Sequence, residues 1–391
     1  MKKSIVVHSF LLLLLFLFMG DCGFSQATGI RTGNRNLSAD YFPDKSVLKY
    51  AKGFSIEYHL THKIIRVTNP WQDSKVVHTY VLVQKGTELP QNIETNKVIW
   101  IPTERIISLS TTNLPFIENL DLVDQLVGVG NTRLINNQKI RHRVQSDKIK
   151  EVGWTSNVDM EKLLILTPDL VITFGVGKSG LEELAIFDEF NVPYVTNTDY
   201  LEPTPLGRAE WIKFIAAFVN KEKLAEELFD KIEAGYLENS RLAETVRNKP
   251  SVFTGSNYKG SWRVPGGKSY LATMLSDAGA SYIWADDNTR GSIPLDLETV
   301  FAKAWDADFW LNVGAWNSIQ ELKAADSHYN GFKSLERKTV YNNNARINQF
   351  GGNDYWESGL ANPHLLLKDL IKIFHPHLLP DHKLNWYKRL E

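Results

Sequence analysis

Two glutamates occupy matching positions in two similar stretches of this chain, and their spacing suggests one partner that touches both. Glu161 lies seven residues before Pro168, which opens an apolar run, and Glu298 lies seven residues before Trp305 in a second such stretch. Carboxylates placed in this way can pair with cations of a partner, which mainly sets orientation and association rate. The alternative is two ordinary acidic residues in the first turns of helices, where the helix dipole favours negative charge.

A second set of residues suits a small ligand with a flat face or an anionic group. Aromatic rings offer planar contact area, a guanidinium binds carboxylates in a bidentate way, and α/β proteins bind ligands at the carboxyl ends of strands. For each ring, burial in the core is the alternative. The candidates that follow strands or lie on loops are Trp154, Phe174, Gly175, Tyr258, Trp262 and Arg263.

Other familiar site patterns are weak or missing. The run from Gly175 to Gly180 fits G-x-G-x-x-G literally, but Ile172 occupies the position where a P-loop needs glycine, so a tight turn is favoured over a nucleotide site. The histidines have no cysteine or carboxylate at standard metal-ligand spacing. Neither G-x-S-x-G nor H-E-x-x-H occurs. We therefore predict no catalytic residues, no metal site and no intrinsic cofactor.

The first 25 residues read as a signal peptide. Lys2 and Lys3 precede an apolar core over 10–19, which is too short to span a bilayer. Cys22, the only cysteine, follows this core and could carry a lipid anchor, although Asp21 stands where a small residue is usual. Cleavage after Ser25 without lipidation is the alternative. Either way we expect an exported protein, periplasmic or membrane-anchored.

Charge and length together exclude nucleic acid as a partner and allow two domains. The chain has 391 residues and a formal net charge of −1, so it lacks the basic footprint of a nucleic-acid-binding protein. Its length suffices for two domains with full cores. We predict a β-rich extension over 46–102, strand–helix alternation over 103–205 and 249–391, and a long amphipathic helical region over 206–248 that Asn220 could interrupt. The fold class is α/β, with two lobes.

The order of these elements resembles the periplasmic substrate-binding proteins of ABC importers for iron-siderophores, haem and cobalamin. The residues that carry the resemblance cover about 103–390. They are the strand and cap from Arg105 to Asn113, the strand from Leu126 to Val129, the block from Glu161 to Val171, the helical region from Leu206 to Arg247, the segment from Trp262 to Ala280, Leu297 with Glu298, and the stretch from Trp356 to Pro363. Trp305 in place of a second proline and the 46–102 extension depart from the pattern.

The resemblance implies two Rossmann-like lobes joined by a long connecting helix, in a monomer that binds ligand but is not an enzyme. It implies that Glu161 and Glu298 dock onto the permease subunits of an ABC transporter. It adds Tyr355 and Trp356 to the ligand-binding candidates, because they match the last cleft loop of the family. The ligand would be a metal chelate, with a ferric siderophore or cobalamin ranked above haem. An exported enzyme or a ligand sensor on the same scaffold is the alternative.

Overall fold

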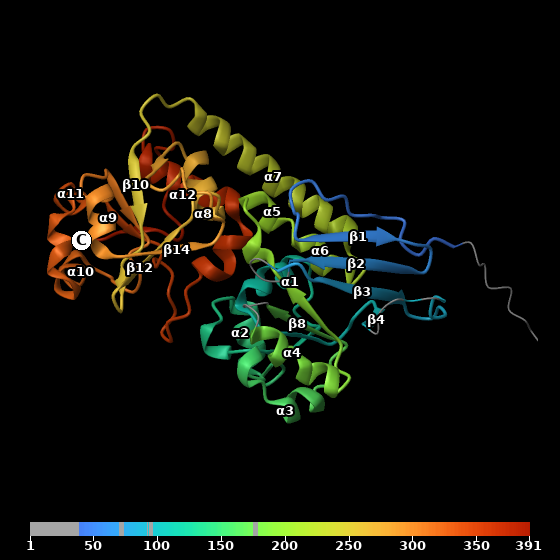
Figure 1. The fold of residues 1–391 in the computed structure, drawn as a ribbon. Coiled ribbons are helices and arrows are strands. Elements are labelled where there is room, and N and C mark those ends of the chain that lie inside the picture. Colours follow the sequence, from blue (N-terminus) through green and yellow to red (C-terminus); the bar gives the residue numbers. More distant parts are fainter. Residues whose placement is uncertain (1–38, 70–73, 92, 94–96, 175–178) are drawn as a thin grey trace, which may run out of the picture. The chain divides into compact units, whose positions relative to one another are not determined.

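The computed structural model describes residues 39–69, 74–91, 93, 97–174 and 179–391 (Figure 1). The predicted signal peptide, Cys22 and Gly175 lie outside these residues. From Ala39 to Glu391 the chain forms one compact unit, so the predicted domain boundaries remain a proposal. No helix in the described part is long and apolar enough to cross a membrane.

The predicted β-rich extension contains a four-stranded sheet. Its strands are β1 (Phe54–Tyr58), β2 (His62–Thr68), β3 (Val77–Gln84) and β4 (Val98–Ile101), in the order β1-β2-β3-β4. The first three pair antiparallel, and β4 joins β3 in parallel. Phe54 places its ring 4.7 Å from that of Trp211 and 5.4 Å from that of Phe214, centroid to centroid, so the sheet shares its core with the helical region.

The segment before this sheet is fixed by two carboxylates, one in the helical region and one just before it. Glu210, which is fully buried, accepts hydrogen bonds from the backbone N–H groups of Lys49, Tyr50 and Ala51 at 2.7–2.9 Å. Glu202 does the same for the next two N–H groups. Backbone donors satisfied by a carboxylate form charge-assisted hydrogen bonds, which are stronger than neutral ones.

The first lobe has a five-stranded, wholly parallel sheet in the order β7-β6-β5-β8-β9. These strands are β5 (Ile106–Ser108), β6 (Leu126–Val129), β7 (Lys150–Glu151), β8 (Leu170–Phe174) and β9 (Tyr194–Asn197). The helices are η1 (Thr111–Asn113), α1 (Leu114–Asn119), η2 (Thr132–Leu134), α2 (Gln138–Gln145), η3 (Thr155–Asn157), α3 (Met160–Ile165), α4 (Ser179–Glu189) and η4 (Asp199–Leu201). The predicted strand–helix alternation is confirmed.

The connecting region is three helices rather than one. They are α5 (Pro205–Ala209), α6 (Ile212–Ala217) and α7 (Glu222–Glu244). Asn220 has a φ of 54°, a left-handed conformation that an α-helix cannot contain, and this residue separates α6 from α7. The predicted interruption at Asn220 is therefore present, and α7 alone forms the long helix.

The second lobe repeats the parallel architecture with a different strand order. Its main sheet runs β13-β10-β15-β16-β17 and is parallel except for β17, and an antiparallel sheet runs β11-β12-β14. The strands are β10 (Ser251–Thr254), β11 (Asn257–Tyr258), β12 (Ser261–Pro265), β13 (Ser281–Tyr282), β14 (Ser292–Leu295), β15 (Phe309–Leu311), β16 (Val340–Asn342) and β17 (Lys388–Arg389).

The helices of this lobe alternate with its parallel strands, as the sequence predicts for 249–391. They are α8 (Tyr270–Asp277), α9 (Leu297–Ala304), α10 (Ile319–Ala325), η5 (Ser327–Gly331), α11 (Lys333–Glu336), η6 (Tyr355–Gly359) and α12 (Pro363–Phe374). The helix α12 lies against α7 (Figure 1). The predicted fold class, α/β with two lobes, a connecting helix and a β extension, is confirmed.

Candidate functional site

A pocket lies at the carboxyl ends of three neighbouring strands of the first lobe, β5, β6 and the edge strand β7. It is lined by Ser108, Leu109, Ser110, Thr111, Leu114, Val129, Gly130, Asn131 and Trp154, which follow or end β5, β6 and β7. Parallel strands all end at the same edge of a sheet, and ligands of α/β proteins bind at that edge. The sequence therefore brings a ring, three hydroxyls and an amide to the place where a ligand is expected.

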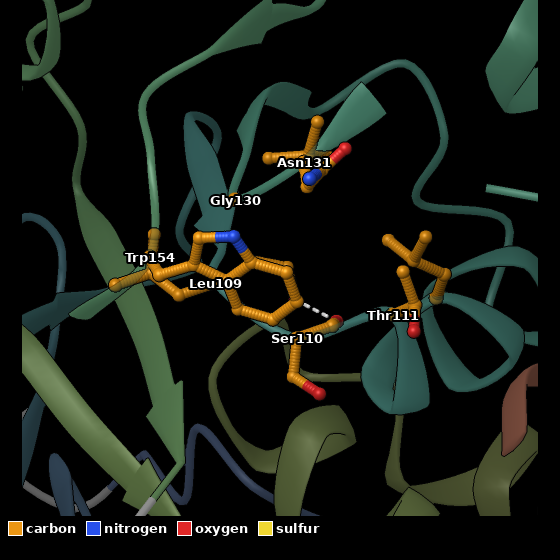
Figure 2. A pocket seen from close by; sticks show the side chains of 9 residues that line it. Leu109, Ser110, Thr111, Gly130, Asn131 and Trp154 are labelled. Carbon is orange, nitrogen blue, oxygen red and sulfur yellow. Dashed lines mark hydrogen bonds between the residues drawn. The ribbon is translucent and has the colours of Figure 1, made fainter. Parts of the chain in front are cut away.

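The Trp154 indole reaches toward Ser110 and Thr111, with Asn131 on another side of the opening (Figure 2). The loop that carries Trp154 turns sharply at Gly153, whose φ is 86° and whose Cβ, if present, would lie 2.6 Å from the carbonyl oxygen of Asn157. Only glycine fits there. The Asn157 side-chain oxygen also accepts a hydrogen bond from the backbone N–H of Trp154 at 3.0 Å, which fixes the backbone that carries the indole.

The hydroxyl side of the pocket is held by hydrogen bonds within one turn. Ser108 donates from its hydroxyl to the Ser110 carbonyl at 2.9 Å, and the Thr112 N–H donates to the Ser110 hydroxyl at 3.3 Å. The cap predicted at Ser110 is therefore formed. Asn113, behind the turn, donates to the Ser108 hydroxyl and accepts from the Asn197 amide. These bonds make the pocket wall a fixed part of the sheet edge.

The pocket is narrow. It has almost no volume into which a water-sized sphere fits, although about 200 Å³ of space not filled by atoms, open solvent included, lies within it. Pockets that bury a whole small molecule usually exceed this volume. A ligand would therefore rest against the mouth and the Trp154 ring, or move that ring aside.

A contact across the chain positions the Asn131 side of the pocket. The Glu357 carboxylate, on η6, accepts hydrogen bonds from the N–H groups of Asn136 and Asn137 at 2.6 and 2.9 Å. The Asn348 amide donates to the Arg133 carbonyl at 2.9 Å. Burial raises the pKa of Glu357, and the two N–H groups act in the opposite direction. Sequence patterns gave no sign of this contact, because its two sides are 221 residues apart.

The predicted residues of the second lobe do not gather at one place. Trp262 and Arg263 are neighbours on β12, where successive side chains point to opposite faces. Trp262 has no exposed surface, donates to the Thr254 carbonyl at 2.9 Å and stacks 5.7 Å from the ring of Trp310. Arg263 points the other way and is exposed. Trp262 is thus a core residue, and we leave it out of the site proposed below.

The other predicted residues differ widely in exposure. Tyr258, the last residue of β11 before a two-residue turn, is 71% exposed, and Trp356 is 52% exposed. Tyr355 is buried, 4.9 Å from the Trp356 ring and 5.8 Å from the Tyr387 ring, and we also leave it out. Phe174 ends β8 and is half-buried, but it does not line the pocket among the described residues. Ligand roles for Trp154, Phe174, Tyr258, Arg263 and Trp356 stay predictions.

Glu161 and Glu298 have the same local setting. Each is the second residue of its helix, and each helix is capped by an aspartate two residues earlier: Asp159 accepts from the Lys162 N–H at 3.1 Å and Asp296 from the Thr299 N–H at 2.6 Å. Both glutamates are exposed. Within the described part of the chain, neither carboxylate has an ion-pair or hydrogen-bond partner.

Exposed apolar side chains follow each of these glutamates. Leu164 and Ile165 are 37% and 72% exposed on α3, and Phe301 and Trp305 are 38% and 45% exposed on and just after α9. Residues three and four positions apart share one face of a helix. We call Glu161, Leu164 and Ile165 the α3 patch, and Glu298, Phe301 and Trp305 the α9 patch.

No cluster of three or more histidine, cysteine, aspartate or glutamate side chains that could hold a metal ion occurs among the described residues. This finding concerns a metal bound directly by such side chains. It leaves open a metal that arrives inside a chelate.

The chain is similar to known proteins over nearly its whole length. A lipoprotein of Methanocaldococcus jannaschii, named as uncharacterized, is 26% identical over 99% of this chain and 96% of its own length. Helicobacter pylori CeuE in a nickel–histidine complex matches 82% of this chain and 91% of its own, at 15% identity and a TM-score of 0.57. S. aureus IsdE complexed with haem matches 69% of this chain and 98% of its own, at 16% identity and a TM-score of 0.52.

The two solved structures establish likeness of fold. The sequence model for the family described as periplasmic binding protein matches residues 106–342, which is more than half of the chain and spans the Trp154 pocket and both patches. The chain belongs to the periplasmic binding protein family.

Proposed function

We propose that this protein is an exported substrate-binding protein that captures a metal chelate at the Trp154 pocket and delivers it to an ABC permease. The observation that carries the proposal is the position of that pocket, at the carboxyl ends of β5, β6 and β7 in a chain of this family. Two structures of similar fold were solved with metal complexes, nickel with histidine and haem, which supports a metal chelate as the ligand class.

The lining favours a ligand with a flat face and neutral polar edges. The Trp154 indole offers a stacking face, while Ser110, Thr111 and Asn131 offer hydrogen-bonding groups without charge. Of the other candidates, only Arg263 would add a cation, for a carboxylate or an anionic chelate. This lining suits a ferric siderophore or cobalamin, and no intrinsic cofactor is part of the proposal.

The α3 and α9 patches are proposed to dock onto the permease. The unpaired glutamates would pair with cationic side chains of the partner and set its orientation. The apolar side chains next to them would supply affinity, at roughly 25 cal/mol per Å² of apolar surface buried. A carboxylate in the first turn of each helix also interacts favourably with the helix dipole, so docking is the role that needs a test.

The test is chelate uptake in cells whose binding protein carries E161Q and E298Q together. The exposed glutamates Glu227 and Glu238 on α7 provide a matched control, E227Q with E238Q, which removes the same charge elsewhere. We expect uptake to fall at least tenfold in the first variant and to stay unchanged in the control, with chelate affinity equal in both. Unchanged uptake in E161Q with E298Q would contradict docking and favour a sensor or an enzyme on this scaffold.

The lipid anchor at Cys22 is part of the same proposal. The M. jannaschii relative carries lipoprotein in its name, which supports an anchor in this chain as well. Replacing Cys22 by serine should release the protein from the membrane fraction. A protein that stays in the membrane fraction after this change, or one that was never there, would contradict the anchor.

A further inference from the structure

Two loops of the second lobe approach each other so closely that only glycine fits between them. A Cβ on Gly266 would lie 2.1 Å from the Thr289 carbonyl oxygen, and one on Gly267 would lie 2.4 Å from the carbonyl oxygens of Ala285 and Asp287. The next N–H, that of Lys268, donates to the Thr289 carbonyl at 3.0 Å. This contact brings Lys268 next to the segment that carries Arg290.

Lys268 and Arg290 both line a pocket of about 480 Å³, distinct from the Trp154 pocket. Its other walls come from α8, from Ala285 and from Pro203 and Thr204, which precede α5. The hydroxyl of Thr273 on α8 donates to the Pro203 carbonyl at 3.1 Å and ties these walls together. The volume is within the range of pockets that hold a whole small molecule.

The two cationic side chains of this pocket, Lys268 and Arg290, have no acidic partner among the described residues at their end of it. Within the part of the chain that the structure describes, neither Lys268 nor Arg290 has an ion-pair or hydrogen-bond partner for its side chain. Two like charges that share a concave surface raise the local potential and attract counter-ions. An ammonium and a guanidinium together match carboxylate or phosphate oxygens, which the guanidinium can bind in a bidentate way.

The one carboxylate of the lining lies at the other end of α8. Asp277 is the last residue of this helix, whereas Lys268 precedes its first residue, Tyr270. The two ends of the helix are roughly 10 Å apart along the axis at 1.5 Å per residue. Its Oδ2 accepts a hydrogen bond from the Tyr236 hydroxyl at 2.6 Å. Burial raises the pKa of Asp277, and the Tyr236 hydroxyl opposes this shift. The carboxylate is thus engaged away from the cationic end.

We propose that this pocket binds a small organic anion through Lys268 and Arg290, at a site separate from the Trp154 pocket. The anion bears carboxylate or phosphate groups at one end, and its other end lies along α8 toward Ser276 and Asp277. Because the pocket also touches Pro203 and Thr204, a bound anion would contact both the second lobe and the segment that leads into α5.

The test is isothermal titration of the mature protein with citrate and, separately, with inorganic phosphate, in a buffer of low ionic strength. The variant is K268Q with R290Q. The control is K323Q with R247Q, which removes one exposed lysine and one exposed arginine that also lack partners in the described residues. All four side chains are exposed, so both proteins should keep the wild-type circular dichroism spectrum and thermal midpoint.

We expect saturable binding of at least one probe to the wild type and to the control, and affinity at least tenfold weaker in K268Q with R290Q. Affinity should also fall as sodium chloride is added, because exposed charges are screened. The probe that binds more tightly identifies carboxylate or phosphate as the preferred group. Absence of saturable binding of both probes at millimolar concentration would overturn the proposal, as would equal weakening in the variant and the control.

Discussion

Acidification should destabilise this protein through a half-buried histidine at the contact between two helices. His364 lies near the start of α12 and packs against Gly235 of α7, where a Cβ on the glycine would lie 3.3 Å from the imidazole. Its Nδ1 is buried and has no hydrogen-bond partner in the described residues. Burial, and then the charge of Lys368 one turn later, lowers the pKa of His364 from 6.5 to about 4.

The magnitude follows from proton linkage. Between pH 6.5 and 4 the unfolded state holds a proton on His364 that the folded state does not, so stability falls as the pH falls through this window. One unit of pKa difference corresponds to about 1.36 kcal/mol of unfolding free energy. At pH 5 protonation of His364 in the unfolded state therefore lowers the unfolding free energy by about 2 kcal/mol. His78, whose pKa burial also lowers to about 4, contributes with the same sign.

The assay is urea unfolding at pH 7 and pH 5, followed by tryptophan fluorescence, on the wild type and on H364Q. We expect the loss of unfolding free energy between these pH values to be about 2 kcal/mol smaller in H364Q than in the wild type. The control is H142Q, at an exposed histidine on α2, which should lose as much stability as the wild type. Equal losses in H364Q and the wild type would refute the reasoning.

Three further predictions concern other parts of the fold and the patches. Glu210→Gln should lower the unfolding free energy by about 3–5 kcal/mol, because the buried Lys213 would lose an ionic partner and backbone N–H groups would lose an acceptor. A smaller loss, measured by urea titration, would contradict the stabilising role of the Glu210 carboxylate. Trp262→Ala should cost about 3–5 kcal/mol with chelate affinity retained, and lost affinity in the folded variant would return Trp262 to the site. Trp305→Ala should weaken binding to permease in detergent severalfold without changing chelate affinity, and unaltered permease binding would limit docking to the glutamates.

The architecture could be predicted from the sequence because its signals are local. Apolar runs such as Leu170–Phe174 mark buried parallel strands, and caps such as Ser110 mark helix starts. The sheet pairings and the strand order are not local, so the different orders of the two lobes could not be predicted. The division of the helical region was visible only at Asn220.

The site was predictable only in part, for a physical reason that differs from residue to residue. Trp154, which lines the pocket, could be named as a candidate because a ring on a loop after a strand is conspicuous. Ser110 and Asn131 could not, because small polar residues at strand ends serve equally as caps. Trp262 and Tyr355 were named as ligand candidates although both are buried, since the sequence shows a ring but not which side of a strand or helix it faces.

Binding of a metal chelate at Trp154 is the property on which the proposed function most directly depends. The measurement is a fluorescence titration of the mature wild type, W154A and W356A with ferric siderophores, cobalamin and haem. We predict saturable quenching by one chelate at micromolar concentration or below in the wild type, and affinity at least tenfold lower in W154A. Saturable binding with equal affinity in W154A and the wild type would contradict the pocket, and no binding of any chelate would contradict the proposed function.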